Sequence, residues 1–188
     1  MSTTVSPMCA VSRMIKEKDP EAVTVFIGPC VAKKSEAQDH KIPGNADYVL
    51  TYGEIRSLLY GKNIELEPEE NSYQASSVFG KRFGDGGGVT AAVLECFKEM
   101  DEDISPNVMK CSGGAECKKA LLLMKVGKLP ADFIEGMACE GGCVGGPSKN
   151  MMAAEAKKFR DSLIGQAAGR KVLENLKNMG ADQVPMHR

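Results

Sequence analysis

One stretch of the chain, from Phe133 to Pro147, places two cysteines within a cluster of glycines. It reads FIEGMACEGGCVGGP, so Cys143 follows Cys139 by four residues, directly after an apolar run. Glycine adopts backbone conformations that other residues avoid, and it lets a bulky group approach the backbone closely. The stretch predicts a strand that ends in a close-packed turn carrying two thiols. If a turn of helix starts at Cys139, both sulfurs face the same point.

Apolar runs and helical patterns alternate along the chain, which predicts an α/β fold with a mostly parallel β-sheet flanked by helices. Ser6 and Pro7 are typical of the start of a helix. The expected strands are 22–28, 47–51, 107–111 and 131–139, and the first of these is continuously apolar, which is typical of a buried strand. The expected helices are 52–63 with Thr51 as its cap, the part of 84–100 after a glycine loop, 115–128, and about 149–179.

Composition excludes several function classes. The net charge of −1 and the isoelectric point of about 6.2 give no electrostatic footprint for nucleic acid. Apolar runs such as Ala120–Met124 are too short to span a bilayer, and the N-terminus lacks the pattern of a secretory signal. We therefore expect a cytoplasmic protein that binds neither nucleic acid nor membrane.

Seven cysteines, an odd number, argue against a disulfide framework and for metal or redox chemistry. Cys30 and Cys139 each lie at the carboxyl end of a predicted strand, at the edge where open α/β sheets bind ligands. Thiolates beside glycines and backbone amides are typical of iron–sulfur clusters. Zinc is the competing metal, but His40 and His187 are the only histidines and neither shares a motif with a cysteine, so zinc is disfavoured.

The other four cysteines carry weaker signals. Cys9 and Cys96 lie on apolar helical faces, where core packing is the expected role of a thiol. Cys111 and Cys117, in CSGGAEC, are separated by five residues, which fits neither the common zinc spacing nor the ferredoxin spacing. A redox pair, a minor metal site and structural thiols all remain open for them.

Two motifs resemble a known family. FIGPCVAKKSEA (Phe26–Ala37) and FIEGMACEGGCVGGP are similar to the second and third signature motifs of the catalytic domain of [FeFe]-hydrogenases, the iron-only hydrogenases. DGGGVTAAVLE (Asp85–Glu95) resembles the glycine loop of that family. The resemblance implies one lobe of the two-lobed iron hydrogenase fold over residues 1–148, as a fragment of a longer protein. A C-terminal helical extension, 149–188, is expected to pack on the same domain.

The resemblance also implies a cofactor, the H-cluster, in which a [4Fe–4S] cubane is joined through one cysteine to a two-iron centre with CO, cyanide and a dithiolate. The cubane ligands would be Cys30, Cys139 and Cys143, and Cys143 would bridge to the two-iron centre. Lys33 would donate a hydrogen bond to a cyanide, and Met137 would pack against the two-iron centre. The implied catalytic residues are thus Lys33, Met137 and Cys143, and further cofactor-binding residues are Pro29, Gly87, Gly88 and Gly142. Lys34, next to Lys33, is expected to be a solvated residue at a helix start.

The chain departs from the family pattern in two places. No Cys-Cys-Pro-Gly-Trp segment, the family's first motif and source of the fourth cubane ligand, occurs among the 29 residues before Cys30. We therefore expect the C-terminal part of a longer hydrogenase that reversibly oxidises H₂. We expect the chain to be inactive alone and to lack the [4Fe–4S] cluster and two-iron centre when isolated. Its expected partners are the N-terminal part of the same protein and ferredoxin or another electron carrier.

The second departure follows Cys143, where the chain continues Val-Gly-Gly-Pro-Ser. This sequence fits divergent branches of the family. The alternative function is therefore an H₂ or redox sensor, or a role in iron–sulfur cluster assembly.

Overall fold

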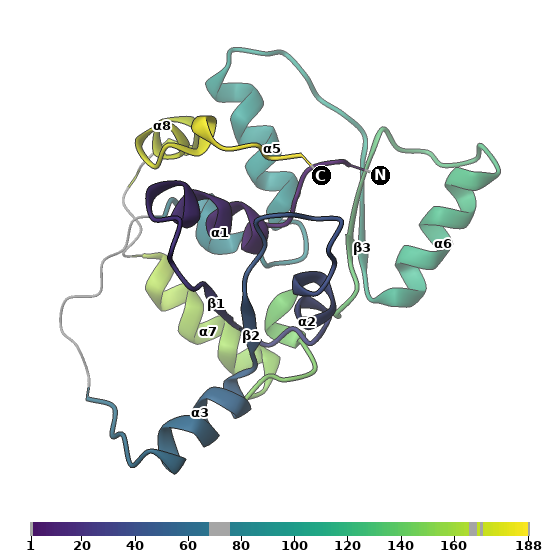
Figure 1. The fold of residues 1–188 in the computed structure, drawn as a ribbon. Helices are drawn as coiled ribbons and strands as arrows, with labels where there is room; N and C mark the ends of the chain where they lie inside the picture. The colour runs from purple at the N-terminus through teal and green to yellow at the C-terminus, as the bar shows by residue number, and fades with distance from the viewer. Residues whose placement is uncertain (1, 68–75, 166–168, 170, 188) are drawn as a thin grey trace. The chain divides into compact units, whose positions relative to one another are not determined.

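The computed structural model describes residues 2–67, 76–165, 169 and 171–187. These residues form two compact units (Figure 1). The first unit combines Met1–Glu70 with Leu176–Arg188, and the second is the continuous stretch Asn71–Asn175. The first unit is therefore built from both ends of the chain.

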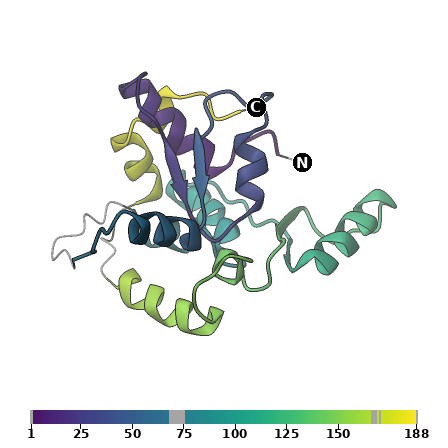
Figure 2. The same cartoon turned by 60° about the horizontal axis from the view of Figure 1, so that its bottom comes forward.

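The first unit begins with α1 (Pro7–Lys18), β1 (Val25–Ile27), α2 (Ala32–Ala37), β2 (Tyr48–Leu50) and α3 (Tyr52–Gly61). β1 and β2 pair in parallel, with Phe26 opposite Val49, and Figure 2 shows the two strands side by side. Met8, Ala46 and Val49 form the buried core, against which Phe26 and Ala37 pack. The two strands, α1 and α2 thus each contribute side chains to one small apolar core.

The last residues of the chain return to its first residues within this unit. The Val5 amide donates to the Met186 carbonyl at 2.8 Å, and Thr4 and His187 form an antiparallel bridge. The Arg13 guanidinium donates to the carbonyls of Pro185 and His187. The 3-10 turn η2 (Ala181–Gln183) lies in this returning segment, so the unit is closed by backbone contacts between the two ends of the chain.

Local signals located the first helix correctly, but the burial expected of the first strand is wrong. Ser6 caps α1 by accepting from the Cys9 amide, and Pro7 is the first helical residue. In β1, Phe26 faces the core, whereas Val25 and Ile27 are 47% and 45% exposed. Among the described residues of the first unit, the core lies on one face of the strand pair, so alternate side chains point away from it. Val23, Val25 and Val11 instead line an open apolar groove of about 410 Å³.

The start of α3 has the expected cap and a charge network around it. Thr51 and Glu54 form a capping box, in which the Glu54 carboxylate accepts from the Thr51 amide at 2.7 Å. Lys34 on α2 donates to both oxygens of that carboxylate and to the Val49 carbonyl. The expectation that Lys34 is simply solvated is wrong, because the fold brings the α3 cap to its ammonium group.

This network predicts a specific loss of stability in acid. The Lys34 hydrogen bond, followed by those from Thr51, lowers the pKa of Glu54 from 4.5 to about 2. The unfolded chain therefore binds more protons than the folded chain between these pH values. The stabilisation is complete above pH 4.5 and is lost as the pH falls to about 2. Solvent screening limits its size, since the carboxylate side chain is 48% exposed. The free energy of unfolding, measured with urea across this pH window, should depend less on pH in Glu54→Gln and in Lys34→Met than in the parent. If its pH dependence in Glu54→Gln equals that of the parent, this assignment is contradicted.

The second unit contains α4 (Val78–Arg82), α5 (Gly88–Glu99), β3 (Val108–Ser112), α6 (Gly114–Lys125), β4 (Phe133–Met137), the 3-10 turn η1 (Cys143–Gly145) and α7 (Ala153–Ile164). β3 and β4 pair in parallel over five residues each, and α6 is the crossover between them. α8 (Val172–Asn178) crosses the division between the units. α7 joins this unit through an ion pair of Arg160 with Asp85 and a hydrogen bond from Lys81 to the Leu163 carbonyl.

The α/β class and the parallel strand pairing are confirmed. Among the described residues the strands form two sheets of two strands, one in each unit. The helical segment expected over 149–179 consists of α7 and α8, and the residues 166–168 and 170 between them lie outside the described part of the chain. The proposed domain boundary between residues 148 and 149 stays a prediction.

Candidate metal centre

The loop that carries Cys139 and Cys143 turns sharply after β4. The Gly142 amide donates to the Cys139 carbonyl at 3.1 Å, and Gly141 and Gly142 have φ angles of +76° and +93°. Side chains rarely adopt such angles, so both positions favour glycine. No turn of helix begins at Cys139, because these two residues reverse the chain first and helical structure begins only at Cys143. The condition under which both sulfurs would face one point is therefore not met.

The glycine loop before α5 packs directly on this turn. The Cys143 amide donates to the Gly84 carbonyl at 2.7 Å, and Asp85 and Gly142 form an antiparallel bridge. A Cβ on Gly142 would lie 2.3 Å from the Gly84 carbonyl oxygen, and a Cβ on Gly84 would lie 3.5 Å from the Cys143 sulfur. The two loops, far apart in sequence, therefore form one close-packed backbone structure around Cys143.

Glu135 on β4 fastens the start of α5 to the sheet. It is 5% exposed and accepts from the amides of Gly87 and Thr90, each at 2.8 Å, and from the Thr90 hydroxyl at 2.5 Å. Gly87, the residue before the helix, has no side chain to cap it, so the carboxylate of a neighbouring strand satisfies the free amides. The sequence reasoning assigned Glu135 no role, although a charged residue within the apolar run FIEGM was a usable signal.

The predicted cofactor-binding glycines Gly87 and Gly88 have a visible packing role. A Cβ on Gly88 would lie 1.9 Å from the Arg82 carbonyl oxygen. Gly87 has a φ of +91°, and its Cβ would lie 3.1 Å from the Lys110 ammonium. Close packing therefore accounts for Gly88 and the positive φ accounts for Gly87, and the contact of both with a cofactor stays a prediction.

A cavity of about 300 Å³ adjoins the turn within the second unit. Its walls include the cations Lys110, Lys157 and Arg160, and the anion Asp85, which is paired with Arg160. Gly141 of the cysteine turn also lines it. The charged side chains that line this cavity beside Gly141 are therefore mostly cationic.

The second motif lies in the first unit, between β1 and α2. Pro29 and Cys30 are half-buried in the connection that leads into α2. The Lys33 ammonium pairs with Glu36 at 2.5 Å, and the other oxygen of Glu36 accepts from the Ser6 hydroxyl at the start of α1. Lys33 is thus held by a carboxylate of its own helix.

Comparison with known proteins shows the family of the chain. Residues 1–147 match the model of the family described as iron only hydrogenase large subunit, C-terminal domain. The chain belongs to this family.

Individual hydrogenases are similar over most of this chain. It is 26% identical to iron hydrogenase 1 of Clostridium pasteurianum, over 78% of this chain and 33% of that protein. It is 29% identical to the periplasmic [Fe] hydrogenase large subunit of Nitratidesulfovibrio vulgaris, over 71% of this chain and 40% of that protein. A solved [FeFe]-hydrogenase structure, studied for oxygen inactivation of its H cluster, matches with a TM-score of 0.65 and 21% identity, covering 97% of this chain and 64% of that one. The chain therefore has the hydrogenase fold and spans well under half the length of these two curated relatives.

The three cysteines that the hydrogenase motifs single out are divided between the units. Cys30 belongs to the first unit, whereas Cys139 and Cys143 belong to the second. Within the part of the chain that the structure describes, no three His, Cys, Asp or Glu side chains are grouped to hold a metal ion. In the second unit alone, two thiols on a turn that has no room for a side chain at Gly142 suit the soft iron of a cluster better than a hard cation. The chemistry of the donors fits the family's cluster, and the ligand set itself stays a prediction.

Cys9 and Cys96, two of the remaining cysteines, are packed against other parts of the protein. Cys9 is completely buried, which confirms the core role expected of it. Cys96 is half-buried on α5. Burial raises the pKa of both thiols, with the Glu99 and Glu95 carboxylates adding to the effect at Cys96. Both environments disfavour a free thiolate, which agrees with a packing role for the two thiols.

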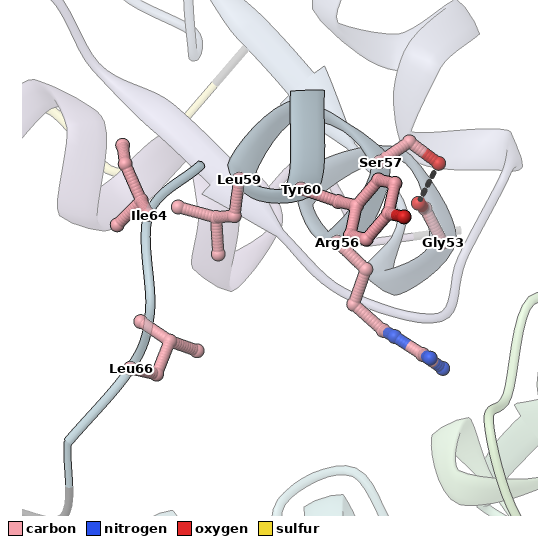
Figure 3. Close-up of a pocket in the computed structure, with 7 residues that line it drawn as sticks. All are labelled: Gly53, Arg56, Ser57, Leu59, Tyr60, Ile64 and Leu66. Carbon is pink, nitrogen blue, oxygen red and sulfur yellow. Dashed lines mark hydrogen bonds between the residues drawn. The ribbon is translucent and has the colours of Figure 1, made fainter. Parts of the chain in front are cut away.

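A second cavity, of about 640 Å³, lies along α3 in the first unit (Figure 3). Leu59, Tyr60, Ile64 and Leu66 supply its apolar wall, and Arg56 is the charged side chain drawn beside them. It contains none of the hydrogenase motif residues.

Among the described helices none is long and apolar enough to cross a bilayer. Because one relative is named as periplasmic, the cytoplasmic location stays a prediction.

Proposed function

We propose that this chain is the C-terminal portion of an iron-only hydrogenase-like protein that contributes Cys30, Cys139 and Cys143 to an H-cluster. The reaction is the reversible conversion of two protons and two electrons to H₂. The observation that carries the proposal is the turn at Cys139–Cys143, which packs without side chains on the glycine loop that precedes α5. Membership of the hydrogenase family and the similarity to a structure with an H cluster support it.

The chain's own residues would hold and orient the cofactor. The cluster, when bound, supplies the electron transfer and the chemistry on hydrogen. Cys143 is presented by a backbone whose amide donates to the Gly84 carbonyl at 2.7 Å, and this hydrogen bond helps to position its sulfur. Met137 stands at the end of β4, where its carbonyl accepts from the Gly113 amide at 2.8 Å, and would pack against the two-iron centre.

Lys33 has a proposed role toward a cyanide ligand of the cluster. Its ammonium has three donors, one of which is used by Glu36 in the structure. The remaining donors are available for a charge-assisted hydrogen bond, which is among the stronger kinds. Glu36 would then orient Lys33 rather than compete with the cluster.

The complete site needs more than this chain. We propose that the N-terminal part of a longer protein supplies the fourth cubane ligand, and that ferredoxin or another electron carrier delivers electrons. The chain alone would then be inactive. This agrees with its coverage of 33% and 40% of the two curated relatives.

Iron binding tests the proposal directly. The experiment uses the chain with the upstream part of the protein restored, because the proposed fourth ligand lies there. After anaerobic reconstitution with iron and sulfide, we expect the site to bind about four irons, the content of one cubane. The Cys139→Ala/Cys143→Ala double variant should lose them. The matched control is Cys111→Ser/Cys117→Ser, a second cysteine pair in the same unit, which should retain them. Equal iron in the Cys139→Ala/Cys143→Ala variant and the parent would refute the ligand assignment.

A non-catalytic role is the second candidate. The Gly145-Gly146-Pro147-Ser148 sequence after the third motif favours an H₂ or redox sensor, or a role in cluster assembly. Hydrogen uptake and evolution assays on the matured full-length protein separate the candidates. Turnover supports the enzyme, whereas a bound cluster without turnover supports the sensor.

A further inference from the structure

Cys111 and Cys117 lie on the same face of the β3–β4 sheet. Cys111 on β3 is the parallel partner of Gly136 on β4, and paired residues of neighbouring strands point to the same side. Cys117 is in the first turn of α6, which packs on this sheet. Its sulfur lies 3.2 Å from the position that a Cβ of Gly136 would occupy. The missing side chain of Gly136 therefore leaves space for the Cys117 sulfur over β4, on the face of the sheet that also carries Cys111.

A tight connection between β3 and α6 holds the two cysteines in this arrangement. Gly113 has a φ of +93°, and its amide donates to the Met137 carbonyl at 2.8 Å. The Ser112 amide donates to the Glu116 carboxylate at 2.8 Å, and the Cys117 amide donates to the Gly113 carbonyl at 3.2 Å. The chain thus reverses immediately after Cys111, and the first turn of α6 folds back over the strand.

The two thiols differ in their access to solvent. Cys111 is 5% exposed, and its pKa is raised by burial first and then by the charge of a Cys117 thiolate. Cys117 is half-buried, and the neighbouring Gly136 is exposed and carries no side chain that could cover it. A small reagent therefore reaches Cys117 first, and Cys111 is protected from reacting alone.

We propose that Cys111 and Cys117 form a reversible dithiol–disulfide pair that is oxidised by low-molecular-weight disulfides. Cys117, as its thiolate, attacks one sulfur of the small disulfide and releases one small thiolate. Cys111 then loses its proton and attacks the Cys117 sulfur of the mixed disulfide, releasing the second. Two protein thiols and one small disulfide become one protein disulfide and two small thiols, so the small disulfide accepts both electrons.

Oxidation of the Cys111–Cys117 pair would change the contacts at the end of β4. In the reduced state the Cys117 thiol donates a weak hydrogen bond to the Met137 carbonyl, at 3.7 Å. A disulfide removes this donor and ties α6 covalently to β3. Met137 is followed two residues later by Cys139, so the pair lies beside the candidate ligand turn. This consequence, unlike the disulfide itself, rests on the proposed function.

Mass spectrometry of the full chain tests the pair, because Lys110 and Lys118 bracket it. Trypsin releases the peptide CSGGAECK, residues 111–118, which contains both cysteines and no other. After exposure of the folded chain to oxidised glutathione, followed by denaturation and alkylation, we expect this peptide to be lighter by two hydrogens and to take up no alkylating group. Treatment with excess reduced dithiothreitol before alkylation should restore two alkylated cysteines.

Single variants define the order of the steps. Cys111→Ser should accumulate a glutathione adduct on Cys117, whereas Cys117→Ser should leave Cys111 largely unmodified in the folded chain. Cys96→Ser, a control outside the pair, should give the same internal disulfide as the parent. Two results would overturn the proposal: a stable glutathione adduct on Cys117 of the parent with Cys111 still reduced, or no modification of the peptide. None of these readouts depends on iron, so failure here is distinct from failure of the hydrogenase proposal.

Discussion

Replacing Gly142 with alanine should destabilise the second unit by about 4 kcal/mol, through a left-handed backbone angle that alanine disfavours and an overlap with neighbouring backbone. The added Cβ would lie 2.3 Å from the Gly84 carbonyl oxygen and 2.9 Å from the Asp85 Cα, at a φ of +93°. Neither contact involves a flexible side chain that could move aside. The bridge to Asp85 and the hydrogen bond from Cys143 to Gly84 should both be lost.

Urea unfolding followed by circular dichroism measures this effect, since the chain has no tryptophan for fluorescence. Gly114→Ala is the matched control, because that position in α6 has open space where the Cβ would lie and no left-handed φ. The control should stay within about 1 kcal/mol of the parent. Iron retained after reconstitution should fall in Gly142→Ala and remain in Gly114→Ala. A Gly142→Ala chain with parental stability would show that the two loops are not packed as described.

The second large effect is expected at Glu135. Alanine at this position removes a buried carboxylate that accepts three hydrogen bonds, leaving two amides and a hydroxyl without their acceptor. The expected loss is about 3 kcal/mol of unfolding free energy. Glu135→Gln keeps one acceptor oxygen and should lose less.

Glu140→Ala, an exposed glutamate in the neighbouring turn, is the control for charge removal and should change stability by less than about 0.5 kcal/mol. A double-mutant cycle with Thr90→Ala should show strong coupling, because both side chains belong to one hydrogen-bond network. If Glu135→Ala and Thr90→Ala are additive, the carboxylate does not anchor the helix through Thr90.

Features with local signals could be predicted from the sequence, and features that depend on distant contacts could not. Ser6, Pro7 and Thr51 indicated helix starts because capping involves residues three positions apart. Glu135 acts on amides 45 and 48 positions away, and Lys34 meets a carboxylate 20 positions away. No local pattern encodes such pairings. The exposure of β1 likewise depends on which layers cover the strand pair, which an apolar run does not specify.

In the candidate site, too, the features with local sequence signals could be predicted and those that depend on distant contacts could not. The cysteine motifs were sufficient to predict the family, which the comparison confirmed. The backbone at Gly141 and Gly142 could not be predicted from the sequence, because glycine permits both helical and left-handed angles and only the packing against Gly84 selects between them. The close packing at Gly88 was also hidden, since it depends on a carbonyl of the preceding turn.

The way the first unit is closed has a consequence for biosynthesis. Its contacts between Val5 and Met186, and between Thr4 and His187, join positions separated by almost the whole chain. Such contacts have the highest entropic cost of loop closure and form late. On the ribosome, the second unit emerges as one continuous stretch and can fold during translation. The first unit can be completed only after residues 176–187 have been synthesised. A stalled or C-terminally truncated nascent chain would therefore display a folded second unit and an unfinished first one, a target for chaperones or proteases.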